Sequence, residues 1–300
     1  MRLITILLIV ALLIGGCDSD TALAPELETV EIALEAPDRY FIHITDIHAD
    51  EPSSSEWWTG FIDMVNASPD KPLFIVATGD IVRDPRPAFW GTLLAPLTKY
   101  DGSFYIDSAR QIPIYFCAGN HDTPSHTCLY CDTVLSQYEY YVGDAVYAID
   151  VAPQLHIISM FSGGTTIEGN GLRSTDMGLM KLALDAHNDT WGSIVLTHHP
   201  YVGPGGFLFV NNREWFLSEC VEHDVDLVLS GHIHHRVYDL EGSGVWNKDG
   251  GPWRDGDGTR FVVTDALKNW CYRKIYLTDT GISPIGPIES FGPVLVAPII

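Results

Sequence analysis

Five short segments of the sequence carry polar side chains that could bind metal ions, and each follows a run of apolar residues. These side chains are carboxylates, imidazoles and one amide, without a thiolate among them. Oxygen and nitrogen ligands of this kind suit Zn, Mn or Fe(II). The segments are Asp46-Ile-His48, Gly79-Asp80, Gly119-Asn120-His121-Asp122, His198-His199-Pro200 and Gly231-His232-Ile-His234.

Each segment alone is weak evidence for a metal site. Asp-x-His arises by chance, Gly-Asp is usually a turn, and a histidine that ends a strand is more often a hydrogen-bonded rim residue than a ligand. Gly-Asn-His-Asp and Gly-His-x-His are more specific, because glycine lets the backbone turn sharply and the polar residues after it can converge. The five segments in this order indicate one shared site.

The apolar runs before these segments have the length and composition of strands buried on both faces. We expect strands at Tyr40–Thr45, Leu73–Thr78, Ile112–Ala118, Leu155–Met160, Ser193–Thr197 and Asp226–Ser230. Helical periodicity occurs in Glu56–Val65, Asp176–His187 and Arg213–His223. Strands that alternate with helices predict an α/β architecture, in which ligands bind at the carboxyl ends of the strands.

Other local patterns lead to three narrower predictions. Asn211 and Glu214 have the spacing of a capping box at the start of the third helix. Four further runs have no helix between them and predict added antiparallel strands: Val146–Val151, Val237–Leu240, Phe261–Thr264 and Arg273–Thr278. The apolar, proline-containing segment 281–300 is expected to be irregular and extended.

The series of motifs resembles the signature of the calcineurin-like metallophosphoesterases, over Tyr40 to about Leu240. Asp-x-His in the first motif, and Arg83 rather than tyrosine three residues after Asp80, resemble the branch that contains cyclic-nucleotide and glycerophosphodiester phosphodiesterases. The resemblance implies a four-layer α/β/β/α sandwich with two mixed sheets, formed by residues 40–280.

The resemblance also implies two divalent transition-metal ions, Mn, Zn or Fe. The first ion would be held by four residues: Asp46, His48, Asp80 and His234. The second would share Asp80 and add three more: Asn120, His198 and His232. His121 would stand beside the substrate and donate a proton to the leaving oxygen.

Such an arrangement predicts phosphoester hydrolysis. Two divalent ions bring four positive charges, of which Asp46, Asp80 and a bridging hydroxide cancel three, so about one remains to attract a phosphate anion. We expect a metal-bound hydroxide to attack small phosphodiesters or phosphomonoesters, with phosphodiesters favoured. Two alternatives are a nuclease of the same fold and a non-catalytic metal-binding surface protein.

Four residues next to the motifs have open roles. Arg83 followed by Asp84 reverses the order found in the Ser/Thr phosphatases of the family. Asp84 could orient His121, Arg83 could bind phosphate, or the two could form a solvated pair. His199 and Asp122 would lie behind the ligands or contact the substrate.

Several aromatic residues could either shape the substrate pocket or pack in the core. Trp57 and Trp58 follow the first motif, and Tyr201 follows His198-His199-Pro200. His43 lies within the first expected strand, where a hydrogen-bonded core histidine is the favoured interpretation.

The N-terminus resembles that of a bacterial lipoprotein. Arg2 precedes the apolar run Leu3–Ile14, which is too short to span a bilayer, so residues 1–16 read as a signal peptide. Gly15-Gly16-Cys17 then resembles a lipobox, with an ordinary signal peptide and a chance cysteine as the alternative. We expect Cys17 to carry a lipid, residues 17–39 to form an acidic tether, and the domain to lie outside the cytoplasm on a bacterial membrane.

Charge and cysteine content narrow the partners. A formal net charge of −22 opposes binding to nucleic-acid backbones, which counts against a nuclease. Cys128 and Cys131 could form a local disulfide, a redox pair or a metal site. Three further cysteines lie in apolar stretches and are expected in the core: Cys117, Cys220 and Cys271.

Overall fold

The computed structural model describes residues 39–51, 55–106, 109, 112–124, 135–152, 155–163, 171–186, 192–202, 211–234, 245–247, 249, 257–278 and 281–291. Residues 39–300 form one compact unit, separate from residues 1–38. Several predictions lie outside the described residues: the signal peptide, Cys17, nearly all of the tether, the Cys128–Cys131 pair, the strand Val237–Leu240 and residues 292–300.

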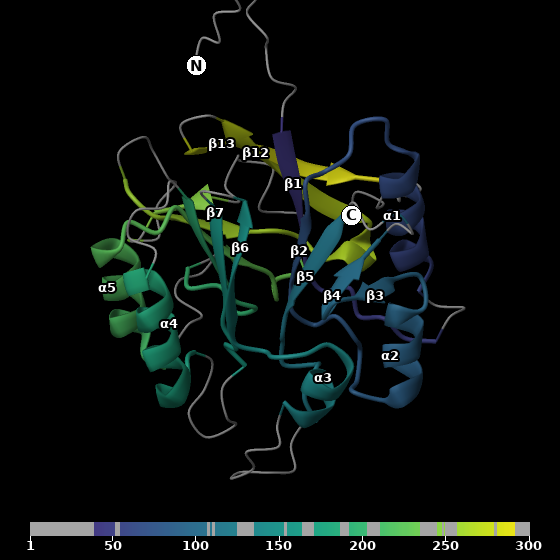
Figure 1. Cartoon of the computed structure of the whole chain (residues 1–300), viewed down its shortest axis with the longest axis horizontal. Coiled ribbons are helices and arrows are strands. Elements are labelled where there is room, and N and C mark those ends of the chain that lie inside the picture. Colours follow the sequence, from purple (N-terminus) through teal and green to yellow (C-terminus); the bar gives the residue numbers. More distant parts are fainter. Residues whose placement is uncertain are drawn as a thin grey trace, which may run out of the picture. The chain divides into compact units, whose positions relative to one another are not determined.

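Two mixed β-sheets lie at the centre of the compact unit (Figure 1). The first contains β1 (Arg39–Ile44), β2 (Ile75–Thr78), β3 (Thr98–Tyr100), β4 (Ser103–Tyr105), β5 (Pro113–Cys117), β12 (Cys271–Thr278) and β13 (Gly281–Ser290). Its order is β13-β12-β1-β2-β5-β4-β3, and β1, β2 and β5 are parallel.

The second sheet contains β6 (Tyr147–Ala152), β7 (Leu155–Ser159), β8 (Gly192–Leu196), β9 (Leu227–Ser230), β10 (Val245–Trp246) and β11 (Arg260–Val263). Its order is β10-β11-β9-β8-β7-β6, and β7, β8, β9 and β11 are parallel.

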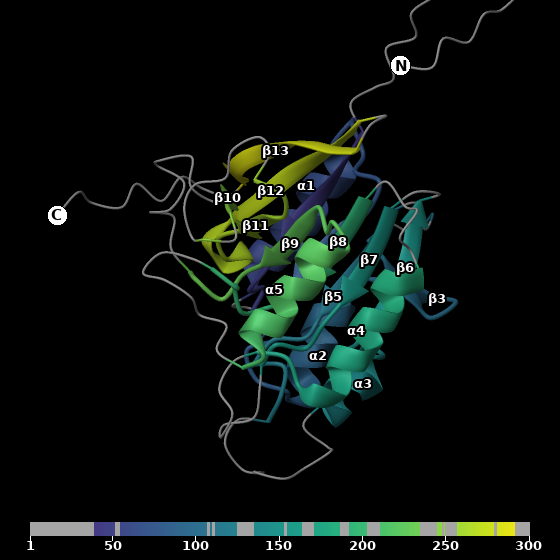
Figure 2. The same ribbon diagram turned by 90° about the vertical axis from the view of Figure 1, so that its left-hand side faces the viewer.

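Helices cover the outer faces of both sheets. They are α1 (Glu56–Ala67), α2 (Pro87–Leu94), α3 (Ser136–Tyr141), α4 (Ser174–Ala186) and α5 (Arg213–Glu222), with the 3₁₀ turn η3 (Leu267–Asn269). Helices α1 and α2 lie beside the first sheet, and α4 and α5 lie in front of β7, β8 and β9 (Figures 1 and 2). The expected four-layer sandwich with two mixed sheets is therefore confirmed.

Strand β1 shows how the sequence builds these layers. Successive side chains of a strand point to opposite faces. Tyr40 and Ile42 join the cluster that includes Trp58 of α1, whereas Phe41 joins the cluster between the sheets with Leu155 of β7. Both faces of the strand are buried, which is why its sequence is continuously apolar rather than alternating.

The predicted strands that precede the motifs and the three predicted helices all form, with ends shifted by one or two residues. Strand β11 is a partial correction: it forms an antiparallel pair with β10, as predicted, but pairs with β9 in parallel orientation. Residues 281–290 are a second correction, since they form the regular edge strand β13 against β12. The capping box predicted from Asn211 and Glu214 is a third correction. Helix α5 begins after Asn212 rather than Asn211, and Asn212 has φ of 55° and forms no side-chain cap.

The three cysteines predicted to be in the core are buried: Cys117, Cys220 and Cys271. Within the described residues, every helix is too short or too polar to cross a membrane.

Candidate metal site

All five motif segments lie at the carboxyl ends of parallel strands, where the two sheets meet. Strands β1, β2 and β5 of the first sheet lead into the Asp46, Asp80 and Asn120 segments. Strands β8 and β9 of the second sheet lead into the His198 and His232 segments. Main-chain hydrogen bonds continue the pairing past the strand ends, as from Asp46 N to Gly79 O at 3.0 Å. The segments are thus held by both sheets.

Several of these residues adopt a backbone conformation that side chains other than glycine rarely adopt. The φ angles are 52° for Asp46, 47° for His48, 49° for Asp80 and 67° for His232. Such conformations cost about 1–3 kcal/mol each and persist where the surroundings enforce them, most often at functional sites. The Trp57 indole contributes here, because its Nε1 donates to the carbonyl oxygen of Ile47 at 2.6 Å.

Four motif residues form a first cluster. Their ligand atoms lie within 4.8 Å of one another: Asp46, His48, Asp80 and His234. His234 Nε2 is 2.6 Å from Asp46 Oδ1, and His48 Nε2 is 3.8 Å from Asp80 Oδ2. The Nε2 atoms of His48 and His234 face each other at 3.4 Å.

A second cluster of histidines adjoins the first. It contains His198, His199 and His232. His198 Nε2 is 3.2 Å from His232 Nδ1 and 3.1 Å from Asp80 Oδ2. Asp80 therefore lies between the two clusters, where a bridging carboxylate would have to be.

The donor set fits divalent metal ions. The Oδ1 atom of Asn120 is buried and has no hydrogen-bond partner among the described residues. An orphaned buried acceptor costs about 1–3 kcal/mol unless something binds it. Imidazole nitrogens face each other in two pairs, His198 with His232 at 3.2 Å and His48 with His234 at 3.4 Å. Within a pair only one nitrogen can donate a proton to the other, whereas a cation could accept a lone pair from each.

Protein hydrogen bonds orient the ligand atoms. The carbonyl oxygen of Thr78 accepts from His198 Nδ1 at 2.8 Å, which directs His198 Nε2 toward Asp80 and His232. Asp46 Oδ2 accepts from Thr45 Oγ1 at 2.7 Å and from His232 N at 2.8 Å, so Oδ1 is the oxygen that faces the histidines. In the same way, Asp80 Oδ1 accepts a hydrogen bond from His121 N at 2.7 Å.

Charge interactions keep both aspartates ionised. Burial by itself would raise the pKa of Asp80, but the charge and hydrogen bond of His198 lower this pKa to about 2. Hydrogen bonds from His234 and His48 hold the pKa of Asp46 well below its usual range against the same burial effect. Ionised carboxylates are the form that binds a cation.

His121 stands at the exposed rim of the site, 4.8 Å from His48 between ring centroids. Its Nδ1 lies 2.8 Å from the carbonyl oxygen of Arg83. A carbonyl can only accept, so Nδ1 carries the proton and Nε2 is the free nitrogen. A backbone carbonyl thus orients His121.

The two side chains of the Arg83-Asp84 pair contact other residues. The Arg83 guanidinium pairs with Asp50, and Asp84 lies 3.4 Å from Arg86 Nη2. Arg83 O, rather than Asp84, is the group that contacts His121, whereas phosphate binding by the exposed Arg83 guanidinium stays a prediction.

Asp122 lies behind the ligands, whereas His199 is a member of the second cluster. Buried Asp122 accepts from Val82 N at 3.0 Å and from Gly119 N at 2.7 Å, and so fixes the shape of the Asn120 loop. His199 is buried, with Nδ1 3.3 Å from Ser162 Oγ.

Ser162 was not identified from the sequence. Its Oγ accepts from the amides of His198 and His199, both at 2.9 Å. It follows the carboxyl end of β7, and this position was the available signal, because the other motifs also follow strand ends.

Lys268 was missed for a related reason. It lies in η3, after β11, whose parallel orientation brings it to the edge of the sheet that holds the site. The amide of Leu267 donates to Thr45 O at 2.7 Å, and that of Lys268 to Asp46 O at 3.4 Å.

The aromatic residues and His43 are largely structural. Trp58 is fully buried and donates to Leu93 O at 2.9 Å, and Tyr201 stacks on Phe261 at 4.8 Å. His43 is fully buried between Thr78 Oγ1 and Thr264 Oγ1, each at 2.8 Å, as expected of a core histidine.

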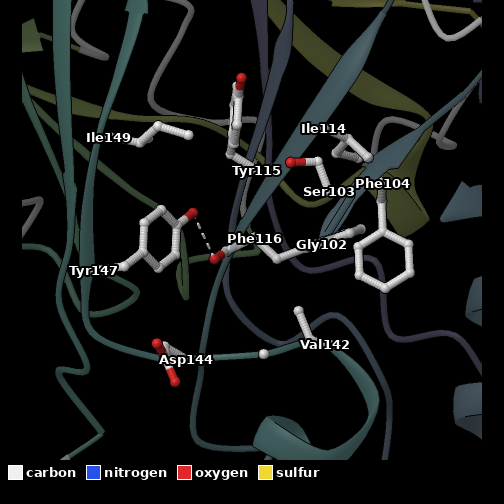
Figure 3. Close-up of a pocket in the computed structure, with 11 residues that line it drawn as sticks. Gly102, Ser103, Phe104, Ile114, Tyr115, Phe116, Val142, Asp144, Tyr147 and Ile149 are labelled. Atoms are coloured by element: carbon white, nitrogen blue, oxygen red, sulfur yellow. Dashed lines mark hydrogen bonds between the residues drawn. The ribbon is translucent and has the colours of Figure 1, made fainter. Parts of the chain in front are cut away.

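A cavity of about 200 Å³ lies between β4, β5 and β6 (Figure 3). Tyr115 and Tyr147 line it, and the Tyr147 hydroxyl donates to Phe116 O at 3.0 Å. Burial raises the pKa of Tyr115 to about 12, so its hydroxyl is neutral. The lining contains none of the motif residues, and the cavity is separate from the two clusters.

Sequence comparison identifies the family. The model of the calcineurin-like phosphoesterases matches residues 40–236. The chain belongs to this family. Family membership and the two Asp/His clusters make it a metal-dependent phosphoesterase. No curated protein sequence matched the chain.

Solved structures with a similar fold include three proteins of low sequence identity. GAP50, the anchor in the inner membrane complex of Plasmodium, is 12% identical with a TM-score of 0.48, over 86% of this chain and 90% of that one. TT1561 of Thermus thermophilus is 14% identical with a TM-score of 0.49, over 85% and 100%. A predicted phosphoesterase from Streptococcus pneumoniae is 12% identical with a TM-score of 0.32, over 85% and 98%. The family assignment rests on the sequence match, and these likenesses add no argument.

Proposed function

We propose that this phosphoesterase hydrolyses small phosphodiesters, and phosphomonoesters less readily, with two divalent ions. The observation that carries the proposal is the position of Asp80, with His48 on one side at 3.8 Å and His198 on the other at 3.1 Å. The preference for diesters rests on Asp46-x-His48 in the first motif, which resembles the phosphodiesterase branch of the family.

The ligands divide between the two clusters. Asp46, His48 and His234 would hold one ion, and Asn120, His198 and His232 the other, with Asp80 shared. When bound, the ions would supply a water of lowered pKa and positive charge for the phosphoryl oxygens.

His121 would donate a proton to the leaving group. Its Nδ1–H is held by the Arg83 carbonyl, so Nε2 is the nitrogen that can carry a second proton to the departing oxygen. The exposed position of His121 at the rim leaves that nitrogen open to a substrate. The net charge of −22 supports small substrates over nucleic acids.

Metal analysis combined with a substrate panel tests this function. The purified full chain should contain close to two transition-metal ions and should hydrolyse an aryl phosphodiester faster than the matching monoester. Chelation should abolish turnover, and Mn, Zn or Fe(II) should restore it. A chain that binds at most one ion, or that hydrolyses neither ester with any of the three metals, would overturn the proposal.

We also propose that Cys17 carries the lipid that anchors the domain outside the cytoplasm. The support is the order of positive residue, apolar run, paired glycines and cysteine in residues 1–17. Cys17→Ser should move the protein from the membrane fraction to the soluble fraction when expressed in bacteria. An unchanged distribution would contradict lipid anchoring.

A further inference from the structure

Lys268 is fixed next to the first metal-ligand cluster by its own main chain. The amides of Leu267 and Lys268 donate to the carbonyl oxygens of Thr45 and Asp46, at 2.7 and 3.4 Å. Asp265 closes the same turn, because its Oδ1 accepts from Ala266 N at 2.7 Å. The backbone of Lys268 is thus positioned by the site itself.

The side chain of Lys268 is half-buried, and the residue follows β11 at the same edge of the sheet as the motif segments that follow β8 and β9. Burial lowers the pKa of Lys268, and three carboxylates oppose this effect: Asp46, then Asp80, then Asp265. The ammonium therefore lies within electrostatic range of Asp46, to whose carbonyl oxygen the Lys268 amide is bonded.

Of the three carboxylates that attract this ammonium, Asp46 and Asp80 are assigned to the metal ions, and Asp265 is not. Among the described residues, no carboxylate forms a direct ion pair with Lys268. Once Asp46 and Asp80 are committed to cations, only Asp265 of the three is left to balance the half-buried ammonium, and it forms no direct ion pair with Lys268. A substrate anion would supply that missing contact, because a partly desolvated charge is costly without a partner.

The Arg83 guanidinium is not available in the same way, since it pairs with Asp50. Lysine also suits the role chemically, because an ammonium on a flexible stem binds phosphate as a point charge and can adjust to its position.

We propose that Lys268 contacts a phosphoryl oxygen of the substrate and strengthens binding in proportion to the negative charge of the phosphoryl group. The inference rests on the proposed function, because it names a substrate contact within that site. It extends the site to β11, a strand that carries none of the five motifs.

Binding of inorganic phosphate to the metal-loaded full chain tests this contact without requiring turnover. Calorimetry would compare the unmodified protein with Lys268→Met, which keeps a long side chain but loses the charge, and with Lys268→Arg, which keeps the charge. Lys99→Met is the matched control, since Lys99 is exposed on β3 and lies over the Phe104 ring. Metal content is measured for every variant.

Lys268→Met should weaken phosphate binding about tenfold, as expected for the loss of a charge-assisted contact. KM for a singly charged aryl diester should rise less, about threefold, because the Coulomb energy scales with the charge of the anion. Lys268→Arg should retain most of the affinity, and Lys99→Met should match the unmodified protein. All variants should keep their metal.

Two results would overturn the contact. One is phosphate affinity of Lys268→Met within twofold of the Lys99→Met control. The other is loss of metal from both Lys268 variants, which would make the residue part of the fold rather than of substrate binding. Failure of the proposed function is distinguishable from failure of the contact. If the unmodified protein hydrolyses no ester, the function is wrong, while a loss of phosphate affinity in Lys268→Met would still support the contact.

Discussion

The Oδ2 atom of Asp80 lies 3.1 Å from Nε2 of His198, although the two residues follow strands of different sheets. Strand β2 ends at Thr78, and the carbonyl oxygen of Thr78 accepts from His198 Nδ1 at 2.8 Å. One strand end therefore both supplies the shared carboxylate and orients the histidine across the sandwich. The packing of the two sheets sets the positions of the proposed ligand side chains, and this explains why ligands from remote segments converge.

Asn120→Ala should have opposite effects on the metal-free and metal-loaded protein. The buried Oδ1 of Asn120 has no partner among the described residues, so its removal costs the metal-free fold little or even stabilises it. With metal, the variant should hold fewer ions, lose nearly all turnover and gain less thermal stability than the unmodified protein. Calorimetry with and without metal measures both effects.

Asn66→Ala, on the exposed face of α1, is the control and should change neither state. His198→Ala should likewise abolish turnover while the protein still folds. Full activity in both site variants would remove Asn120 and His198 from the metal centre.

His121→Ala should separate catalysis from metal binding. The His121 side chain lies at the rim and contacts Arg83 O, whereas its main-chain N–H, which the substitution preserves, is what contacts Asp80. We expect full metal content and a kcat lowered about 10²–10⁴-fold, the usual contribution of a general acid. The loss should be smaller for a substrate whose leaving group needs no proton, such as a nitrophenolate. Equal losses for good and poor leaving groups would argue against proton donation.

The sequence predicts the main strands and the metal-ligand segments because buried parallel strands leave a strong apolar signal, and the polar residues after them are few. It does not predict the direction of β11, because a short apolar run pairs equally well in either direction until its neighbours are placed. Ser162 and Lys268 were missed for this kind of reason, since their contacts cross between loops that only the fold brings together. The partner of His121 is a backbone carbonyl, and every residue has one, so no sequence pattern marks it.

Gly231→Ala should damage the site through simple overlap. A Cβ at this position would lie 1.7 Å from Thr45 Oγ1 and 2.5 Å from Asp46 Oδ2. Thr45 and Asp46 would have to move, so we expect a lower melting temperature together with weaker metal binding. Gly91→Ala in α2 is the control, because nothing lies within 4 Å of its Cβ and alanine favours a helix by about 0.5–1 kcal/mol. Metal affinity that is unchanged in Gly231→Ala would mean that the Asp46 loop tolerates displacement.

His223 should make stability depend on pH through contacts that include none of the metal-binding motif residues. Its Nε2 lies 2.8 Å from Asp185 Oδ1 of α4 and its Nδ1 lies 3.0 Å from Glu219 O, so both ring nitrogens meet acceptors and the protonated form satisfies both. Burial works against the charge, but the Asp185 hydrogen bond raises the pKa of His223 above its usual value.

Because this pKa is raised in the folded state, the stabilisation is fully present below about pH 6.5, the unfolded value, and is lost as pH rises through the higher folded value. The melting temperature of His223→Gln should fall furthest below that of the unmodified protein at pH 5.5–6.5, and the gap should narrow at higher pH. Asp185→Asn should show the same narrowing. A gap that stays constant from pH 5.5 to 9 would contradict the charged pair.

Ser162→Ala should destabilise the protein more than the same change at Ser159, although both serines are buried and lie near the end of β7. Ser162 Oγ accepts two buried amides, those of His198 and His199, and each would lose its partner at about 1–3 kcal/mol. Ser159 Oγ instead donates to Ala145 O at 3.1 Å, and a buried carbonyl tolerates a missing donor better than an amide tolerates a missing acceptor. Because His198 is a proposed ligand, Ser162→Ala should also weaken metal binding, whereas Ser159→Ala should not. Denaturant unfolding with metal titration measures both quantities, and equal destabilisation without a change in metal affinity would show that Ser162 does not position His198.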